Sequence, residues 1–297
     1  IVIFLMTRAL LPVSTTRAIV GAIIGWNLFT GHKTDARLLT TIVTTWVASP
    51  VIGAVFSAIF YILLRALLRR LQLHLVILDV YIKWALIVVG AFGAYSLGAN
   101  NIANVMGVFA GSAPDIVIDL GLFSLNGLQV LFLLGGIAIA IGILTYSKDL
   151  MMQVGRGIMA LSAEAAIVTV LSQAVVLFLF SSTALYEALK SAGLPAIPLV
   201  PVSSSQVIVG SIIGIGLVKG VNEIKFKTIR GIVMGWILTP VAAGLLSFLS
   251  LFFVKNLFNL NVGTDISITG SVPVTQTDAA ITVAETTRHI NLIWPGI

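Results

Sequence analysis

Two stretches of the sequence repeat each other and decide the fold. Residues 12–31 read PVSTTRAIVGAIIGWNLFTG, and residues 201–220 read PVSSSQVIVGSIIGIGLVKG. Eleven of the twenty positions are identical at an offset of 189 residues, and the Trp-x-x-x-Pro motif that begins at Trp46 returns at Trp236. Apolar composition alone would match Ile, Val and Gly, but not the Pro-Val-Ser opening and the later tryptophan and proline. The chain therefore contains an internal duplication.

The composition around these stretches is that of an integral membrane protein. Of the 297 residues, 58% are hydrophobic and only 9% are charged, and the mean hydropathy is +1.10. Soluble domains contain about 25% charged residues, so a soluble globule, a disordered chain and a nucleic-acid binder are excluded. The net charge of +6 lies in short loops rather than on one face. Because the chain has no cysteine, disulfides, thiol catalysis and cysteine-ligated zinc are excluded as well.

Seven apolar segments are candidates for membrane crossings. Two of them, 12–29 and 201–218, are short and begin at a proline, which is typical of re-entrant or discontinuous helices. The basic loops at 65–83, 147–156 and 219–230 are predicted to be cytoplasmic. The sequence thus predicts an all-α, polytopic membrane protein with re-entrant or broken helices. Its segments are expected at 12–29, 38–64, 84–110, 128–146, 161–182, 201–218 and 228–254.

The order of these segments gives the relation between the two copies. Five predicted crossings separate the starts of the copies, and an odd number places them on opposite sides of the membrane. We therefore expect an inverted-topology repeat, which many secondary transporters have. Because the chain begins inside an apolar stretch, the first repeat is expected to be truncated at its N-terminus. The expected parts are a first repeat (1–64), a basic cytoplasmic or interfacial connector (65–83) that includes an amphipathic helix (65–76), a second repeat (84–255) and a polar tail (256–297).

Each copy opens with a proline and a run of hydroxyl residues, immediately before an apolar helix. A helix N-terminus carries partial positive charge and unpaired N–H donors, so it binds anions. Ordinary helix capping explains a single run of this kind. Two runs in inverted copies favour one tetrahedral oxyanion held from both sides. The predicted substrate-binding hydroxyls are those of Ser14, Thr15, Thr16, Ser203, Ser204 and Ser205.

The residue after each hydroxyl run is also predicted to bind the substrate. It is Arg17 in the first copy and Gln206 in the second. An arginine in an apolar segment is costly and needs a partner. That partner is either the anion or the polar interface, which a snorkelling side chain reaches.

A second polar motif, Gly98-Ala99-Asn100-Asn101-Ile102-Ala103-Asn104, lies inside the apolar segment 84–110. Its amides need hydrogen-bond partners. They either join neighbouring helices, or they line a broken helix, where amide oxygens bind a cation and N–H groups an anion. The glycines at 93, 98 and 107 favour a break. We predict Asn100 and Asn101 as substrate ligands and Asn100, Asn101 and Asn104 as coupling-ion ligands.

The remaining polar residues do not indicate catalysis. Glu164, near the start of segment 161–182, is expected at the headgroup level rather than as a carrier of a coupling proton. No Ser/His/Asp set, HExxH motif or phosphate-binding loop occurs in the sequence. The sequence therefore predicts neither an enzyme nor an ATP-driven pump, with no catalytic residue, no cofactor and no metal beyond a coupling Na⁺.

These motifs resemble those of the inorganic phosphate transporter (PiT) family, including its sulfate permease members. Residues 98–104 resemble its GANDxAN signature, and residues 12–17 and 201–206 resemble its PVSTTH motif. The resemblance extends to about residue 255. It implies a symporter for phosphate or sulfate that is coupled to Na⁺ or H⁺ and works by alternating access. It further implies a homodimer in the lipid bilayer of a prokaryotic inner or plasma membrane.

Three departures from the family pattern bear on the substrate. Asn101 stands in place of the aspartate, Arg17 and Gln206 stand in place of histidines, and the first-half copy of GANDxAN is missing. Without the carboxylate the site favours sulfate, which carries no proton, whereas the family default favours phosphate. Both anions stay open, as do Na⁺ and H⁺. An anion channel and an anion-binding membrane receptor on the same fold are the alternatives.

Overall fold

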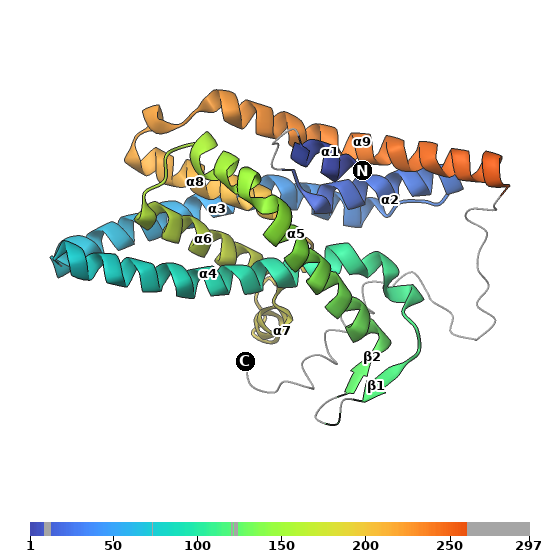
Figure 1. The fold of residues 1–297 in the computed structure, drawn as a ribbon, viewed down its shortest axis with the longest axis horizontal. Coiled ribbons are helices and arrows are strands. Elements are labelled where there is room, and N and C mark those ends of the chain that lie inside the picture. Colours follow the sequence, from blue (N-terminus) through green and yellow to red (C-terminus); the bar gives the residue numbers. More distant parts are fainter. Residues whose placement is uncertain (9–12, 73, 120, 122–123, 260–297) are drawn as a thin grey trace.

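A computed structural model gives the fold of residues 1–8, 13–72, 74–119, 121 and 124–259 (Figure 1). In this part of the chain the structure is α-helical apart from one short antiparallel hairpin, which confirms the predicted all-α class. The elements in chain order are α1 (Val2–Arg8), α2 (Thr15–Thr30), α3 (Ala36–Leu71), α4 (Leu75–Met106), the 3₁₀ turn η1 (Gly107–Ser112), β1 (Val117–Asp119), β2 (Ser124–Asn126), α5 (Gly127–Gly157), α6 (Ala163–Ser181), α7 (Thr183–Ser191), α8 (Ser204–Lys219), the 3₁₀ turn η2 (Val221–Glu223) and α9 (Phe226–Phe258).

Five helical stretches are long and apolar enough to cross a membrane: Ala36–Leu71, Leu75–Ser112, Gly127–Thr145, Ala163–Ser181 and Phe226–Phe258. The two helices that carry the repeated sequence are shorter. Helices α2 and α8 have 16 residues each, or about 24 Å at the α-helical rise. This is less than the roughly 30 Å of a hydrocarbon core.

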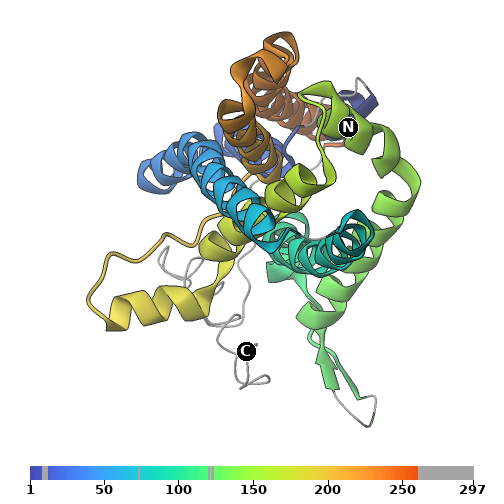
Figure 2. The same ribbon diagram turned by 90° about the vertical axis from the view of Figure 1, so that its left-hand side faces the viewer.

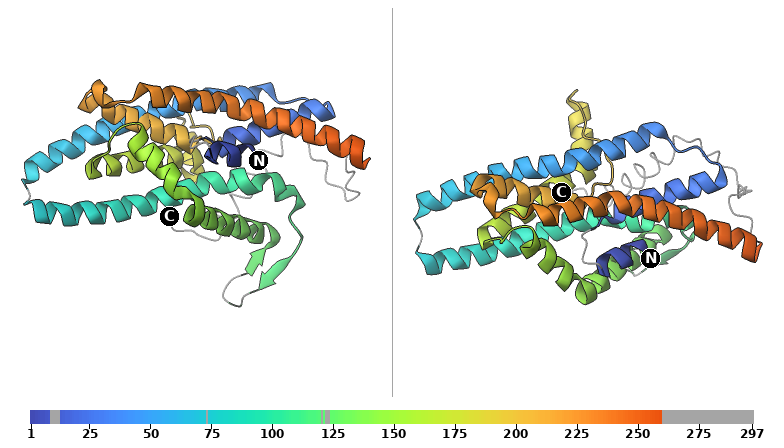
Figure 3. Two further views of the ribbon diagram at one scale, coloured as in Figure 1. Left: turned by 45° about the horizontal axis from the view of Figure 1, so that its top comes forward. Right: turned by 90° about the horizontal axis from the view of Figure 1, so that it is seen from above.

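The helices of the two copies of the repeat pack against each other. Gly21 and Gly25 of α2 meet the backbone of Pro240 and Gly244 in α9, and Figure 3 shows these helices side by side in both views. In the same way, Gly210 and Gly214 of α8 meet the backbone of α3 at Pro50 and Ala54. Residue numbers rise together along each pair, so the helices of each pair run in the same direction. The short helix of each copy therefore lies against the long helix of the other.

The core gathers around α8. One apolar cluster joins residues of α3, α6, α8 and α9, among them Tyr61, Val168, Ile212 and Trp236. A second cluster joins Trp46 to residues of α6 and to the segment that leads into α8. Away from this core, α7 and the β1–β2 hairpin project from the bundle (Figure 2). The first turn of α8 thus begins inside the protein, which places the second hydroxyl run.

The structure differs from the sequence prediction at two places. The break expected near Gly98 is wrong, since α4 is helical through residues 98–104 and tightens into a 3₁₀ turn only at Gly107. The stretch 65–76 is not a separate amphipathic helix, because residues 65–71 continue α3 and Leu75 already begins α4. The polar tail expected from residue 256 lies, beyond Asn259, outside the described residues.

Candidate functional site

The first hydroxyl run forms the N-terminal end of α2. Ser14 is the N-cap residue, and its hydroxyl accepts a hydrogen bond from the backbone N–H of Arg17 at 3.5 Å. Ser14 and Thr16 are buried, and Thr15 is half-buried. The capping that the sequence suggested as an ordinary explanation is therefore present at this end.

The second hydroxyl run forms the N-terminal end of α8, but its first hydroxyl is used differently. Ser203 is at the N-cap position, yet its side chain makes no capping hydrogen bond. Its Oγ lies 3.2 Å from the Oγ of Ser205 instead. Ser203 is buried, whereas Ser204 and Ser205 are half-buried. This end therefore presents paired hydroxyls at the positive end of a helix.

Helix α4 connects the two ends through its asparagines. The Asn100 side chain donates to the carbonyl oxygen of Val202 at 2.9 Å and accepts from the N–H of Val202 at 3.2 Å. One turn later, the Asn104 amide donates to Oγ1 of Thr16 at 2.9 Å and to the Asn100 carbonyl oxygen at 3.1 Å. Residues 88 and 102 positions apart in sequence therefore meet at one side of α4.

The structure thus brings both predicted motifs together, and it does so without unwinding the helix. Asn100 and Asn104 are buried, and Asn101 is half-buried with its Oδ1 3.4 Å from the Asn100 amide nitrogen. Asn104 joins α4 to α2, which is the interhelical hydrogen bonding that the sequence left open as one interpretation, and Asn100 joins α4 to the segment just before α8. Their predicted contacts with substrate and coupling ion stay predictions.

Arg17 lies beside these groups but is directed at two tryptophans. Its side chain is only 7% exposed, and Nη1 donates to the carbonyl oxygen of Trp236 at 2.7 Å. The guanidinium carbon lies 4.6 Å from the ring centroid of Trp46 and 5.5 Å from that of Trp236. No carboxylate of the described residues is within ion-pair distance. The side chain is thus held by a carbonyl and by aromatic faces, and its contact with an anion remains a prediction.

Gln206, the counterpart of Arg17, is enclosed more completely. It is 2% exposed, and its Oε1 has no hydrogen-bond partner. Nε of Arg17 and the indole nitrogen of Trp46 are likewise buried without a partner. Buried polar atoms without partners are uncommon in folded proteins. Three of them around the ends of α2 and α8 mark a region with unused hydrogen-bonding capacity.

Two features of the site were not predicted from the sequence. Trp46 and Trp236 were recognised as part of the repeat, but not as the residues that enclose Arg17; their recurrence in both copies was the available signal. Gln173 of α6 lies with its Nε2 3.4 Å from the carbonyl oxygen of Ser204. The signal there was a lone amide within an apolar helix.

Two cavities lie elsewhere, at the opposite end of α8. One has a volume of about 540 Å³ and is lined by residues of α3, α6 and α8, Glu164 and Lys219 among them. Within the described residues, no group of three or more His, Cys, Asp and Glu side chains that would hold a metal ion occurs. A coupling cation at the asparagines would therefore rely on amide, hydroxyl and carbonyl oxygens.

Comparison with known protein families gives one match. The sequence profile described as the phosphate transporter family matches residues 1–247, which include both hydroxyl runs and the asparagine motif. No solved structure matches the chain.

Individual relatives carry names of the same kind. A protein of Thermococcus kodakarensis is 31% identical over 169 residues, which cover 55% of this chain and 37% of the relative. One of Pyrococcus furiosus is 29% identical over 166 residues, or 54% of this chain and 35% of the relative. One of Methanocaldococcus jannaschii is 25% identical over 168 residues, or 57% and 46%. All three are named as candidate phosphate permeases, and this chain spans less than half of the length of each.

Proposed function

This chain belongs to the phosphate transporter family, and we propose that it carries inorganic phosphate across the membrane as a secondary transporter. The apolar helices and the family match make it an integral membrane protein. The family is one of transporters, which places the chain outside the enzymes. The observation that carries the proposal is the meeting of both hydroxyl runs at Asn100 and Asn104.

The chemistry of this meeting point suits a tetrahedral oxyanion. Two helix N-termini supply partial positive charge and N–H donors. Hydroxyls of both runs and the amide of Asn101 supply further donors. Because Ser203 does not cap its own helix, an anion that binds its hydroxyl would replace only the contact with the hydroxyl of Ser205 and no helix cap.

The exchange of partners between the copies supports transport by alternating access. Helix α8 runs in the same direction as α3, and α2 in the same direction as α9. With each short helix followed by its long helix in a hairpin, α2 and α8 point in opposite directions, as an inverted repeat requires. In this mechanism the two hairpins move relative to each other around the anion and open one side at a time.

Sulfate is the second candidate substrate, and Asn101 is the observation that favours it. Hydrogen phosphate carries a proton that a carboxylate would accept, whereas the amide of Asn101 offers one acceptor and two donors. Arg17 adds a fixed positive charge nearby. Phosphate stays the first candidate because the family match supports it.

Side-chain oxygen atoms at the same meeting point could also bind a coupling ion. The amide oxygens of Asn101 and Asn104 and the hydroxyl oxygen of Thr16 would bind Na⁺ without a formal negative charge, which makes the site weak. Coupling to H⁺ is the alternative. We further propose that the protein acts as a homodimer.

The proposal is tested by uptake of labelled phosphate and labelled sulfate, side by side, into proteoliposomes that contain the full-length protein. Proton and Na⁺ gradients are imposed separately. We expect accumulation of phosphate above its equilibrium level under one gradient. Passive equilibration would indicate a channel, binding without uptake a receptor, and sulfate uptake that excess phosphate does not block a sulfate permease. Uptake of neither anion would overturn the proposal.

A matched pair of variants localises the site. Ser203→Ala removes a hydroxyl that does not cap the helix, so we expect the variant to fold normally. Its uptake should be roughly tenfold weaker, which is the effect of losing one hydrogen bond to a charged group. Ser250→Ala, on the exposed side of α9, is the control and should leave uptake unchanged. Equal uptake by both variants would remove Ser203 from the binding site.

A further inference from the structure

The cavity of about 540 Å³ at the far end of α8 is lined by basic, acidic and apolar side chains. Leu64 and Leu68 contribute an apolar wall. The charged lining residues are the basic Arg65, Arg69 and Lys219 and the acidic Glu164 and Glu223, so basic groups are in excess by one. Arg65 and Arg69 are one turn apart on α3 and are both exposed, so they reach the cavity from the same side of the helix. A basic rim over an apolar wall suits an amphiphilic ligand that carries negative charge.

The depth of the cavity in the membrane follows from α3. No charged residue lies between Arg37 and Arg65, and the offset of 28 positions between them corresponds to a rise of about 42 Å along the helix. A bilayer measures about 40–45 Å with its headgroup regions included. Arg37 and Arg65 therefore lie at the two headgroup levels, so the phosphate groups nearest to Arg65 and Arg69 are those of lipids.

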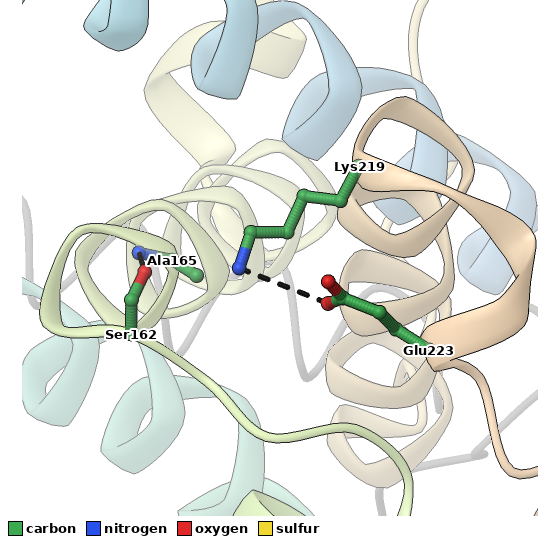
Figure 4. Close-up of polar contacts among 4 residues, drawn as sticks. All are labelled: Ser162, Ala165, Lys219 and Glu223. Atoms are coloured by element: carbon green, nitrogen blue, oxygen red, sulfur yellow. Dashed lines mark hydrogen bonds and ion pairs between the residues drawn. The ribbon is translucent and has the colours of Figure 1, made fainter.

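Of the three basic groups in the cavity, Lys219 faces a carboxylate of the protein, whereas the two arginines have no ion-pair partner among the described residues. Lys219 reaches from α8 toward Glu223, beside the first turn of α6, with Nζ 3.9 Å from Oε2 (Figure 4). Neither Arg65 nor Arg69 has a carboxylate at ion-pair distance among the described residues. Two adjacent guanidinium groups without a carboxylate bind phosphate well, since each offers several N–H donors in a fixed plane.

We propose that this cavity binds the headgroup of a phospholipid. Arg65 and Arg69 hold its phosphodiester, and Leu64 and Leu68 line the glycerol and the upper part of an acyl chain. Glu164, half-buried in the same lining, accepts a hydrogen bond from the headgroup. The site therefore prefers phosphatidylethanolamine or phosphatidylglycerol, whose headgroups have a donor, to phosphatidylcholine, which has none.

The test is native mass spectrometry of the full-length protein in detergent, titrated with each of these three lipids. In Arg65→Gln/Arg69→Gln we expect a loss of bound lipid of about fivefold for each arginine, the effect of one basic residue near a lipid surface. Arg65→Lys/Arg69→Lys, which keeps the charge, should retain part of the binding. Arg70→Gln is the matched control, because Arg70 lies at the same end of α3 but not in the cavity lining.

Four results would overturn this assignment. One is an equal loss of lipid in Arg70→Gln, which would mean that the charge of this end of the protein is responsible. Another is displacement of the lipid by millimolar inorganic phosphate, which would identify a second site for the free anion. A third, measured on the unaltered protein, is equal retention of all three lipids, which would remove the role of Glu164. The fourth is unchanged lipid binding in Arg65→Gln/Arg69→Gln.

Discussion

Helices α2 and α8 carry related copies of one sequence but have different surroundings. Helix α8 is covered by α3 and α6, and nine of its 16 residues are buried. Helix α2 lies against α9, and only five of its 16 residues are buried. Ile23 is 44% exposed and Leu28 is 71% exposed. The comparison teaches that the sequence of a repeat sets its helix and its glycine contacts, while the neighbours set how firmly the helix is held.

The N-terminal ends of the two helices also differ in their surroundings. At the start of α2, Arg17 is 7% exposed and has a carbonyl and two aromatic faces as partners. At the start of α8 the equivalent residue is the neutral Gln206, whose side-chain oxygen has no hydrogen-bond partner. Exchanging or removing the residues that distinguish the ends tests whether enclosure explains the difference.

The largest effect is expected from Gln206→Arg, which places the first copy's charge in the second. A buried charge without a counter-ion costs several kcal/mol, roughly 3–5 here, so this variant should lose most of its folded protein. The reverse change, Arg17→Gln, removes one hydrogen bond and the contacts with Trp46 and Trp236, at a cost of about 1–2 kcal/mol. Thermal unfolding in detergent, followed by size-exclusion chromatography, measures both. Equal stability of the two variants would contradict the comparison.

The next effect concerns the glycine contacts that join the copies. An added side chain at Gly210 meets the backbone of Pro50, and one at Gly21 meets the backbone of Pro240. Overpacking of this kind typically costs about 1–3 kcal/mol. The destabilisation by Gly210→Val should lie at the upper end of this range, because α8 has no free side toward which to move. That by Gly21→Val should lie at the lower end, because α2 is covered less. Gly98→Ala on α4, where nothing lies within 4 Å, is the control in the same unfolding assay.

A third prediction compares the two asparagines by which α4 contacts the starts of α8 and α2. Asn100→Ala removes both hydrogen bonds to the backbone of Val202 and leaves buried groups unpaired, at about 1–3 kcal/mol. Phosphate uptake should therefore fall roughly tenfold or more. Asn104→Ala removes the bond to the hydroxyl of Thr16, which can rotate to another partner whereas the backbone groups of Val202 cannot, so the decrease should be smaller. Initial uptake rates in proteoliposomes measure both, and a larger loss in Asn104→Ala would reverse the proposed order.

The fold was predictable from the sequence to the extent that it depends on local pattern. The lengths of the apolar segments predicted the long helices. The Pro-Val-Ser motif predicted the starts of α2 and α8 to within a few residues. The break near Gly98 was predicted wrongly because glycine was taken as a sign of unwinding. A helix surrounded by lipid and protein keeps its backbone hydrogen bonds even at glycine, since no water replaces them.

The candidate site was predictable in its members but not in its contacts. The hydroxyl runs and the asparagines were identified, because polar groups in apolar helices require partners. Which partners they take depends on the packing of helices that are far apart in sequence. Nothing in the local pattern distinguishes Asn100, which binds the backbone of Val202, from Asn104, which binds the side chain of Thr16.

The smallest effect is expected from Thr16→Val, which removes one hydroxyl and almost no volume. Asn104 keeps its second acceptor, the Asn100 carbonyl oxygen, so its amide is not left unpaired and the cost should be only about 0.5–1.5 kcal/mol. If Thr16 also binds the anion, phosphate uptake will fall by more than this loss of stability explains, with a raised KM. Measuring KM and the unfolding temperature on the same preparation separates the two roles. An unchanged KM would leave Thr16 as a link between α2 and α4 and would place the anion closer to the α8 end.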